Sequence, residues 1–175
     1  MSLILANNVC EASYKLRFPA QPVLRPLTPW ETVQTPYPLG STQQWALVEP
    51  FIYQSDRFGQ IAIPATPLPV GKTGFVTDLA SIPSLLQNAL QNDSPQILCA
   101  SIIHDWGFWM AGEVMPGRVL TFDQVNELLA EAMWYLNATD LQRNAVFSAV
   151  HVGGRGDWNA DCDRVGHPER KVSLV

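Results

Sequence analysis

The chain has 175 residues, of which 47% are hydrophobic and 15% are charged, and its formal net charge at pH 7 is −5. This length is typical of one domain with an extensive core, and the composition is typical of a compact globular protein. The acidic charge, without any cluster of lysine and arginine, argues against binding to a nucleic-acid backbone, and no apolar run is long enough to cross a membrane.

The cysteines and the first residues bear on the compartment of the protein. Cys10, Cys99 and Cys162 are far apart and form no Cys-x-x-Cys pair, so neither a zinc ribbon nor a disulfide framework is expected. The chain begins with a short apolar run that lacks the basic segment of a signal peptide. We therefore expect a reducing, aqueous compartment, at least until the cell lyses.

The first 40 residues are predicted to form an extended arm. Prolines forbid a long helix there and disfavour a strand in the middle of a sheet, and they stand at positions 19, 22, 26, 29, 36 and 38. Several leucines, together with Trp30 and Tyr37, make the segment too apolar for a flexible linker in water. The arm is expected to lie over the domain or over a neighbouring subunit.

A small antiparallel sheet is predicted after the arm. Between Trp45 and Ile63 the hydrophobic side chains recur with a period of two, which indicates a hairpin with its turn at residues 55–59. Residues 74–76 are predicted to form a third short strand. This strand ends next to Asp78, and a strand end is a common place for a functional carboxylate.

A helix that is buried on all sides is predicted at Ile97–Trp109. Ser94 and Pro95 supply an N-cap and a first-turn proline, and the apolar side chains, Cys99 among them, fall all round the helix. The helix also carries His104 and Asp105, far from other charges. Because burying an unpaired carboxylate is very unfavourable, Asp105 must be paired, hydrogen-bonded or bound to a metal.

Three further helices are predicted around this buried one. A short helix opens at Ser81 and extends to about Leu90. The next begins with a capping box formed by Thr121 and Gln124. Its inward stripe consists of Val125, Leu128, Leu129, Ala132 and Leu136, and the side chains expected to face water are Glu127 and Glu131.

The last predicted helix opens at Thr139 and ends at Gly153–Gly154. Its inward side chains are expected to be Leu141, Ala145, Ser148 and Val152. Four aromatic residues at helical spacing are assigned to the core, namely Trp106, Phe108, Trp109 and Trp134. The fold class is therefore α+β, a small antiparallel sheet followed by a cluster of about four helices. Its parts are an extended arm at 1–40, one domain at 41–158 and a C-terminal tail at 159–175.

Four polar side chains are expected to converge on the buried helix, namely Asp78, His104, Asp105 and Asn126. Carboxylates with a histidine can bind zinc, manganese or iron, and an aspartate can equally orient a histidine that acts as a general base. A satisfied polar network inside the core explains the same residues without any chemistry. Asp78 could also cap the helix that opens at Ser81.

Two other interpretations of polar residues are weaker. An HD-type phosphohydrolase needs a second histidine upstream, whereas His151 and His167 both lie downstream. Residues 157–163 carry oxygens at alternate positions as a calcium loop does, but Cys162 stands where the loop needs glycine and Pro168 where it needs glutamate. A solvated turn is expected there instead.

Three motifs resemble the domain-of-unknown-function family 1353, which is found in phages, prophages and some bacteria. They are Gly-Phe-Val-Thr-Asp-Leu-Ala-Ser-Ile-Pro at 74–83, Ile-His-Asp-Trp at 103–106 and Asn-Glu-Leu-Leu-Ala-Glu-Ala-Met at 126–133. The resemblance covers about residues 43–158 and implies a phage setting without naming a reaction. The family usually has aspartate where this chain has Asn126, which weakens a metal site made of three carboxylates. The arm and the insert at 64–72 look additional, as would suit a part that docks into a larger assembly.

Two functions remain open on this basis. In the first, Asp78, His104 and Asp105 bind a divalent zinc or manganese ion or activate water in a hydrolase, with peptidoglycan or a host metabolite as substrate. In the second, the same residues form a core polar network of a virion tail or baseplate component, and the arm contacts other phage structural proteins. A homo-oligomer and a host-directed inhibitor also remain open. Localisation is expected in the host cytoplasm, with incorporation into the virion in the second case.

Overall fold

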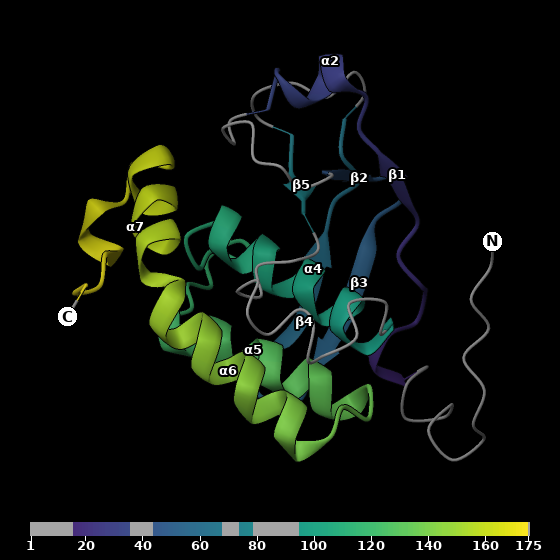
Figure 1. Cartoon of the computed structure of the whole chain (residues 1–175), viewed down its shortest axis with the longest axis vertical. Coiled ribbons are helices and arrows are strands. Elements are labelled where there is room, and N and C mark those ends of the chain that lie inside the picture. Colours follow the sequence, from purple (N-terminus) through teal and green to yellow (C-terminus); the bar gives the residue numbers. More distant parts are fainter. Residues whose placement is uncertain (1–15, 36–43, 68–73, 79–94, 175) are drawn as a thin grey trace.

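The computed structural model describes residues 16–35, 44–67, 74–78 and 95–174 of the chain. Along these residues, short strands are followed by helices, which confirms the predicted α+β class (Figure 1). The elements are β1 (Leu24–Pro26), α2 (Pro29–Thr32), β2 (Trp45–Leu47), β3 (Phe51–Ser55), β4 (Gly59–Ile63), β5 (Val76–Thr77), α4 (Pro95–Trp109), α5 (Phe122–Tyr135), α6 (Asp140–Gly153), α7 (Arg155–Arg164) and the 3-10 helix η1 (Pro168–Arg170). The short helix expected from Ser81 and the N-cap Ser94 lie outside the described residues.

The strands form two small antiparallel sheets. One has the order β1-β2-β5, and the other is the hairpin β3-β4, in which Phe51 pairs with Ile63 and Ser55 with Gly59. This hairpin and its turn confirm the prediction from the period of two. In β1, Pro26 stands on an edge strand, where its missing N–H group leaves no gap in the middle of the sheet.

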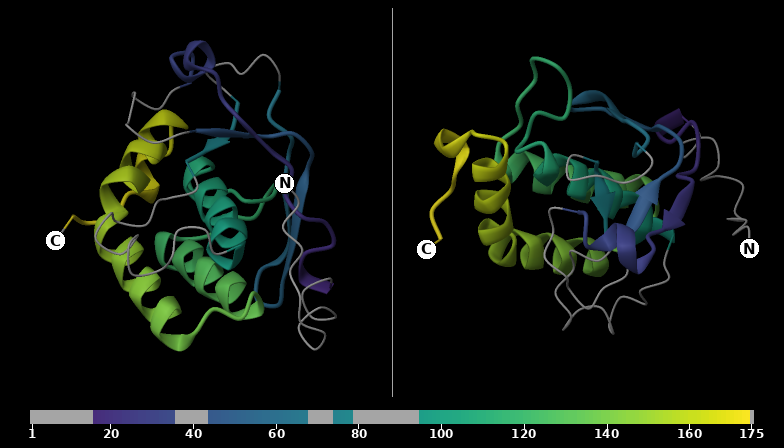
Figure 2. Two further views of the ribbon diagram at one scale, coloured as in Figure 1. Left: turned by 45° about the vertical axis from the view of Figure 1, so that its right-hand side comes forward. Right: turned by 90° about the horizontal axis from the view of Figure 1, so that it is seen from above.

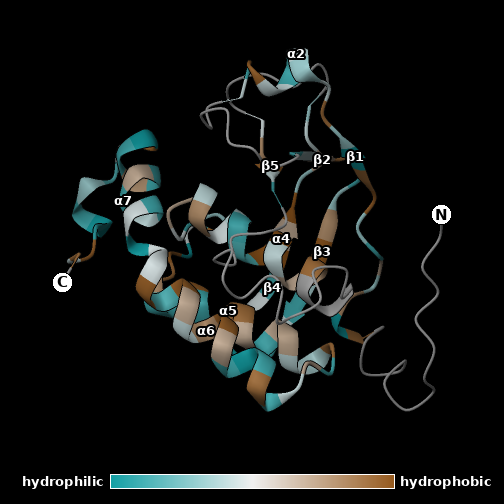
Figure 3. Cartoon of the chain, in the orientation of Figure 1, coloured by the Kyte–Doolittle hydropathy of each residue, from teal (hydrophilic) through white to brown (hydrophobic). Residues whose placement is uncertain are grey.

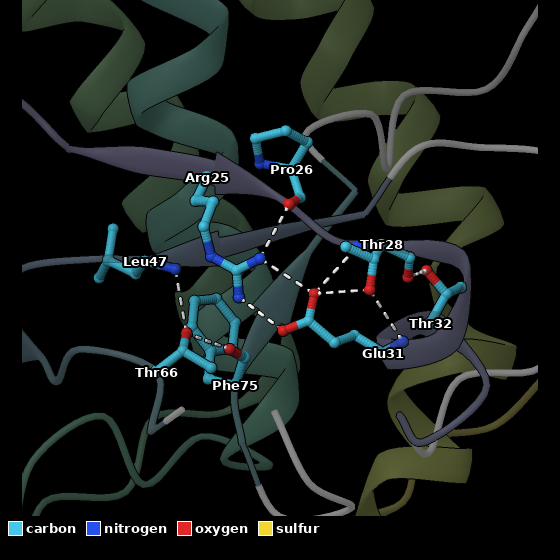
Figure 4. A network of polar contacts seen from close by, with 8 residues as sticks. All are labelled: Arg25, Pro26, Thr28, Glu31, Thr32, Leu47, Thr66 and Phe75. Atoms are coloured by element: carbon cyan, nitrogen blue, oxygen red, sulfur yellow. Dashed lines mark hydrogen bonds and ion pairs between the residues drawn. The ribbon is translucent and has the colours of Figure 1, made fainter. Parts of the chain in front are cut away.

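The described part of the N-terminal segment is built into the domain. Phe18 is only 1% exposed, and its ring lies 6.1 Å from that of Phe51 and 4.9 Å from that of Tyr53. Next to β1, Glu31 closes a capping box with Thr28, and both oxygens of its carboxylate accept hydrogen bonds from Arg25, at 2.9 and 2.7 Å (Figure 4). Losing this segment would therefore remove part of the core and of a sheet.

Thr66 connects the central strand of the larger sheet, β2, to the residue that precedes the edge strand β5. Its hydroxyl accepts a hydrogen bond from the Leu47 amide at 3.0 Å and donates one to the Phe75 carbonyl at 2.6 Å (Figure 4). The Phe75 ring then packs edge-on against Trp106, at 5.3 Å. The sheet is thereby fixed against α4.

Helix α4 occupies the middle of the molecule, as its apolar sequence predicts. Residues 101–109 are all buried, and Figure 1 shows the strands on one side of α4 and α5, α6 and α7 around the other. Helix α5 comes very close at Gly107, because a Cβ atom there would lie 2.5 Å from Cγ1 of Val125. None of the helices within the described ranges has both the length and the apolar character of a membrane span.

Helix α5 begins with the predicted capping box and buries the predicted stripe, but two of its residues were placed wrongly. Glu131 does not simply face water, because its Oε1 accepts hydrogen bonds from the Tyr53 hydroxyl and the Asp56 amide, at 2.9 and 3.0 Å. Trp134 is 55% exposed and does not belong to the core. It stands in the last turn of α5, beyond the buried face of the helix.

Helix α6 also begins with a capping box, formed by Thr139 and Gln142, yet its predicted inward face is wrong. The buried side chains are those of Val146 and Val150. Leu141 and Val152 are 80% and 77% exposed, Ser148 is exposed and Ala145 is half-buried. The sequence offers two neighbouring apolar stripes on this helix, and packing selected the other one.

Helix α7 replaces the solvated turn that the sequence predicted over residues 157–163. Trp158 and Cys162 are 1% and 0% exposed and, being four residues apart, fix one face of α7 to the core. The Trp158 ring contacts Phe108 at 5.4 Å and Phe122 at 5.7 Å. Figure 2 shows α6 and α7 running one after the other along the outside, and Figure 3 shows that α7 is mainly hydrophilic.

Candidate functional site

Two adjacent polar residues lie inside the most buried helix. His104 is 2% exposed and Asp105 is 7% exposed, both in the middle of α4. Successive side chains of a helix point about 100° apart, so the two residues face different neighbours. The expectation that polar groups must meet this helix in the core is confirmed on both sides, by Asn126 of α5 and by Thr77 of β5.

His104 meets α5 through Asn126. Its Nε2 atom lies 2.9 Å from Oδ1 of Asn126, a side chain that is 0% exposed. The imidazole also packs on the ring of Phe108, one turn further along α4, with a centroid distance of 4.3 Å. A hydrogen bond and a ring contact therefore fix the orientation of His104.

Asp105 meets the end of β5 through Thr77. The Thr77 hydroxyl donates a hydrogen bond to Oδ2 of Asp105, and Thr77 itself is 2% exposed. Asp78 is the next residue of the chain and is half-buried at the same strand end. The predicted meeting of this strand end with α4 thus occurs through a threonine that sequence analysis did not select.

The two polar residues of α4 also approach each other. Nδ1 of His104 lies 3.9 Å from Oδ1 of Asp105, which is too long for a direct hydrogen bond. The ion-pair attraction exists only when the imidazole is protonated. The four side chains of Thr77, Asp105, His104 and Asn126 form a buried polar line from β5 across α4 to α5, which we call the polar line.

A second buried carboxylate, Asp161 of α7, was missed as a candidate. It is 6% exposed, and its Oδ1 accepts a hydrogen bond from Nε of Arg164 at 3.0 Å. Burial raises the pKa of Asp161 to about 6 against the opposing effect of Arg164, and the negative charges of Asp157 and Asp105 raise this pKa further. The spacing of Trp158 and Cys162 was the signal that could have placed Asp161 beside a buried helix face.

Arg164 connects this carboxylate to the end of α4. Its guanidinium lies over the ring of Trp109, 3.8 Å from the centroid, and one nitrogen donates to the Trp109 carbonyl. Trp109 is four residues after Asp105 and so lies on the same face of α4. The pair of Arg164 and Asp161 therefore lies against the same face of α4 that carries Asp105.

Divalent ions need several oxygen, nitrogen or sulfur ligands around one point. In the part of the chain that the structure describes, no three His, Cys, Asp or Glu side chains are grouped closely enough to hold a metal ion. Of the four residues assigned to a metal by sequence analysis, Asn126 has its Oδ1 engaged with His104, while Asp78, His104 and Asp105 stand around the junction of β5 and α4. This arrangement supports base chemistry at His104 more directly than a complete metal site.

Comparison with known proteins gives one match. The model of a family described as "Protein of unknown function (DUF1353)" matches residues 45–150. No curated protein and no solved structure matches the chain. The polar line and Asp78 lie inside the matched range, whereas Asp161 and Arg164 lie after it.

Proposed function

This chain belongs to the family DUF1353, whose description names no activity, and from its site we propose that it is a metal-assisted hydrolase. In this proposal His104 is the general base, and the carboxylates of Asp78 and Asp105 would supply two of the ligands of a zinc or manganese ion. We further propose a phage setting, with peptidoglycan or a host metabolite as the substrate. The observation that carries the proposal is the 3.9 Å approach of His104 Nδ1 to Asp105 Oδ1 at a strand end.

Two features support a catalytic use of this arrangement. A general base needs a fixed orientation, and His104 is held by Asn126 and Phe108. Nδ1 of His104 is not tied up in a direct hydrogen bond to Asp105, because the two atoms are 3.9 Å apart.

The proposed reaction is the addition of water to a carbonyl or phosphoryl group. His104 takes one proton from water, the oxygen forms a bond to the electrophilic atom, and the bond to the leaving group breaks as that group takes the proton back from His104. A bound ion would lower the pKa of the water and polarise the substrate oxygen. The Thr77 hydroxyl binds Oδ2 of Asp105, and Oδ1 is the oxygen 3.9 Å from Nδ1 of His104.

The first experiment measures bound metal. The metal content of the purified full-length protein is compared with that of Asp105→Asn and Asp78→Asn, and Asp163→Asn on the exposed face of α7 is the matched control. We expect zinc or manganese in the wild type and the control, and loss of at least half in the two site variants. Equal metal content in all four proteins, including none, would remove the ion from the proposal.

The second experiment measures hydrolysis. The wild type, His104→Ala and the exposed-histidine control His167→Ala are tested on peptidoglycan, on a chromogenic ester and on a chromogenic phosphate. Loss of a general base typically lowers a rate by about 10² to 10⁴, so His104→Ala should lose that much while His167→Ala keeps full activity. A folded His104→Ala variant with wild-type rates would refute the hydrolase proposal.

A second candidate function is assembly into a phage tail or baseplate through the N-terminal segment. Its support is the exposed apolar pair at α2, where Trp30 and the C-cap residue Val33 are 64% and 53% exposed. Large exposed apolar side chains mark contact surfaces when they occur together. Helix α2, which carries Trp30, stands at the end of the molecule away from α6 in Figure 1.

Testing this candidate needs point variants, because Phe18 and β1 are parts of the fold. The double variant Trp30→Ser/Val33→Ser is compared with Leu174→Ser, which changes an exposed side chain near the C-terminus. If the segment binds other structural proteins of a particle, the double variant should be depleted from purified particles at least tenfold while remaining folded in the host cytoplasm. Incorporation equal to that of Leu174→Ser would dispose of the assembly role.

A further inference from the structure

We infer that Asn126 is a positioning residue that fixes the tautomer of His104, with the proton on Nε2 and the reactive lone pair on Nδ1. The tautomer is inferred from the placement of Oδ1 of Asn126 against Nε2, whereas the reactivity of Nδ1 rests on the proposed hydrolase function. The inference gives Asn126 a role different from the metal ligation that its sequence position suggested. It also names the ring atom that would take the proton from water.

The contact between the two side chains determines where the proton lies. The carbonyl oxygen of an asparagine side chain can only accept a hydrogen bond, and Oδ1 of Asn126 is the atom 2.9 Å from His104 Nε2. Nε2 must therefore carry a hydrogen. In a neutral imidazole the other nitrogen then has the free lone pair, which makes Nδ1 the base.

The surroundings of Nδ1 agree with this assignment. Oδ1 of Asp105, at 3.9 Å, is beyond direct hydrogen-bond length. A hydrogen on Nδ1 would gain no complete bond to this carboxylate. The complete bond of the ring goes to Asn126, so the proton is best satisfied on Nε2.

Rigid neighbours hold the pair in place. Asn126 is 0% exposed on the inner face of α5, and the Phe108 ring packs on the imidazole from the same helix as His104. The other end of the amide, Nδ2 of Asn126, is buried and has no hydrogen-bond partner among the residues that the structure describes.

The test reads the tautomer directly by NMR in the resting full-length protein. Long-range ¹H–¹⁵N correlation distinguishes protonated from unprotonated ring nitrogens, and the spectrum of His104→Gln identifies the signals of His104. The variants are Asn126→Asp, which keeps an acceptor oxygen, and Asn126→Leu, which removes it. The matched control is Asn144→Asp on the exposed face of α6.

The wild type, Asn126→Asp and Asn144→Asp should each show a proton on Nε2, and Asn126→Leu should shift the neutral ring toward a proton on Nδ1. A wild-type ring protonated on Nδ1 alone would overturn the inference, as would an unchanged tautomer in Asn126→Leu. If Asn126→Leu fails to fold, the wild-type and Asn126→Asp spectra still decide where the proton lies.

Kinetics then separate this inference from the proposed function. If both hold, Asn126→Leu should lower kcat at least tenfold with little change in KM, and Asn126→Asp should retain most of the rate. If no hydrolysis is found for the wild type while the spectra show the Nε2 proton, the hydrolase proposal fails and the tautomer assignment stands. If hydrolysis requires His104 but the spectra show the Nδ1 proton, the role of Asn126 fails and the hydrolase proposal stands.

Discussion

The hydroxyl of Thr77 donates a hydrogen bond to Oδ2 of Asp105, and this single contact joins β5 to the middle of α4 across 28 positions of the chain. Both residues are almost fully buried, at 2% and 7% exposure. The contact engages Oδ2 of the carboxylate, while Oδ1 lies 3.9 Å from Nδ1 of His104. A strand of two residues thereby determines how the buried carboxylate is oriented.

Replacing Thr77 by valine should destabilise the protein. Valine keeps the shape and the strand preference of threonine but removes the hydroxyl, so the buried Asp105 carboxylate loses a hydrogen bond. The expected loss in the free energy of unfolding is about 1–3 kcal/mol, measured by urea denaturation at pH 7. Thr77→Ser keeps the hydroxyl and should lose clearly less. Equal stability of Thr77→Val and the wild type would mean that the hydrogen bond contributes nothing net.

A second prediction concerns the close approach of α4 and α5 at Gly107. An added Cβ atom would lie 2.5 Å from Cγ1 of Val125, a stiff side chain that is 0% exposed, so the helices would have to move apart. Gly107→Ala should therefore lower the free energy of unfolding by about 1–3 kcal/mol in urea. At Gly156 of α7 nothing lies within 4 Å of the added atom. Gly156→Ala should be neutral or stabilising by up to about 1 kcal/mol. If both variants lowered the free energy of unfolding, the packing argument would be contradicted.

Much of the fold was predictable because its elements carry strong local signals. The alternation in β3 and β4, the capping boxes of α5 and α6, and the apolar sequence of α4 each indicated the right element at nearly the right place. The need for a polar partner of Asp105 was also predictable, because burial of a lone carboxylate is too costly. What the sequence could not indicate was which partner is used. A threonine in a strand has an ordinary β-strand role, and nothing marks its hydroxyl as the contact.

The remaining errors have a common physical origin in tertiary packing. Glu131 was expected in water, but the turn after β3 comes close enough for the Asp56 amide to bind it. Trp134 and Leu141 have the residue types of a core, yet both lie near the α5–α6 connection, where no described element covers them sufficiently. In α7, the burial of Trp158 and Cys162 fixes the helix to the core although most of its other residues are polar. Periodicity describes one helix at a time, whereas burial depends on the neighbours.

The ion pair of Glu31 and Arg25 should make stability depend on pH in acid. The hydrogen bonds from Arg25, followed by those from Thr28, lower the pKa of Glu31 to about 2. In the unfolded chain this carboxyl titrates near pH 4.5. The stabilisation is therefore complete above that pH and is lost as the pH falls toward 2. Glu31→Gln should melt at a lower temperature than the wild type at pH 7, and the gap should narrow between pH 4.5 and 2. A gap that does not change with pH would show that the charge of Glu31 is unimportant.

Asp161 should act in the opposite direction, because burial raises its pKa to about 6. Between the ordinary carboxyl range near pH 4 and pH 6, the folded protein keeps a proton that the unfolded chain has already released. Its contribution to stability is therefore largest at low pH and is lost as the pH rises through 6. Asp161→Asn removes this titration and keeps an acceptor for Arg164, while the other charges facing the group, Asp157 and Asp105, stay in place. Relative to the wild type, the variant should gain up to about 3 kcal/mol in the free energy of unfolding between pH 4 and pH 7, measured by urea denaturation at several pH values. Asp163→Asn changes an exposed neighbour on the same helix and should show no such trend. If the free energies of unfolding of Asp161→Asn and the wild type changed in parallel with pH, Asp161 would titrate like an ordinary surface carboxylate.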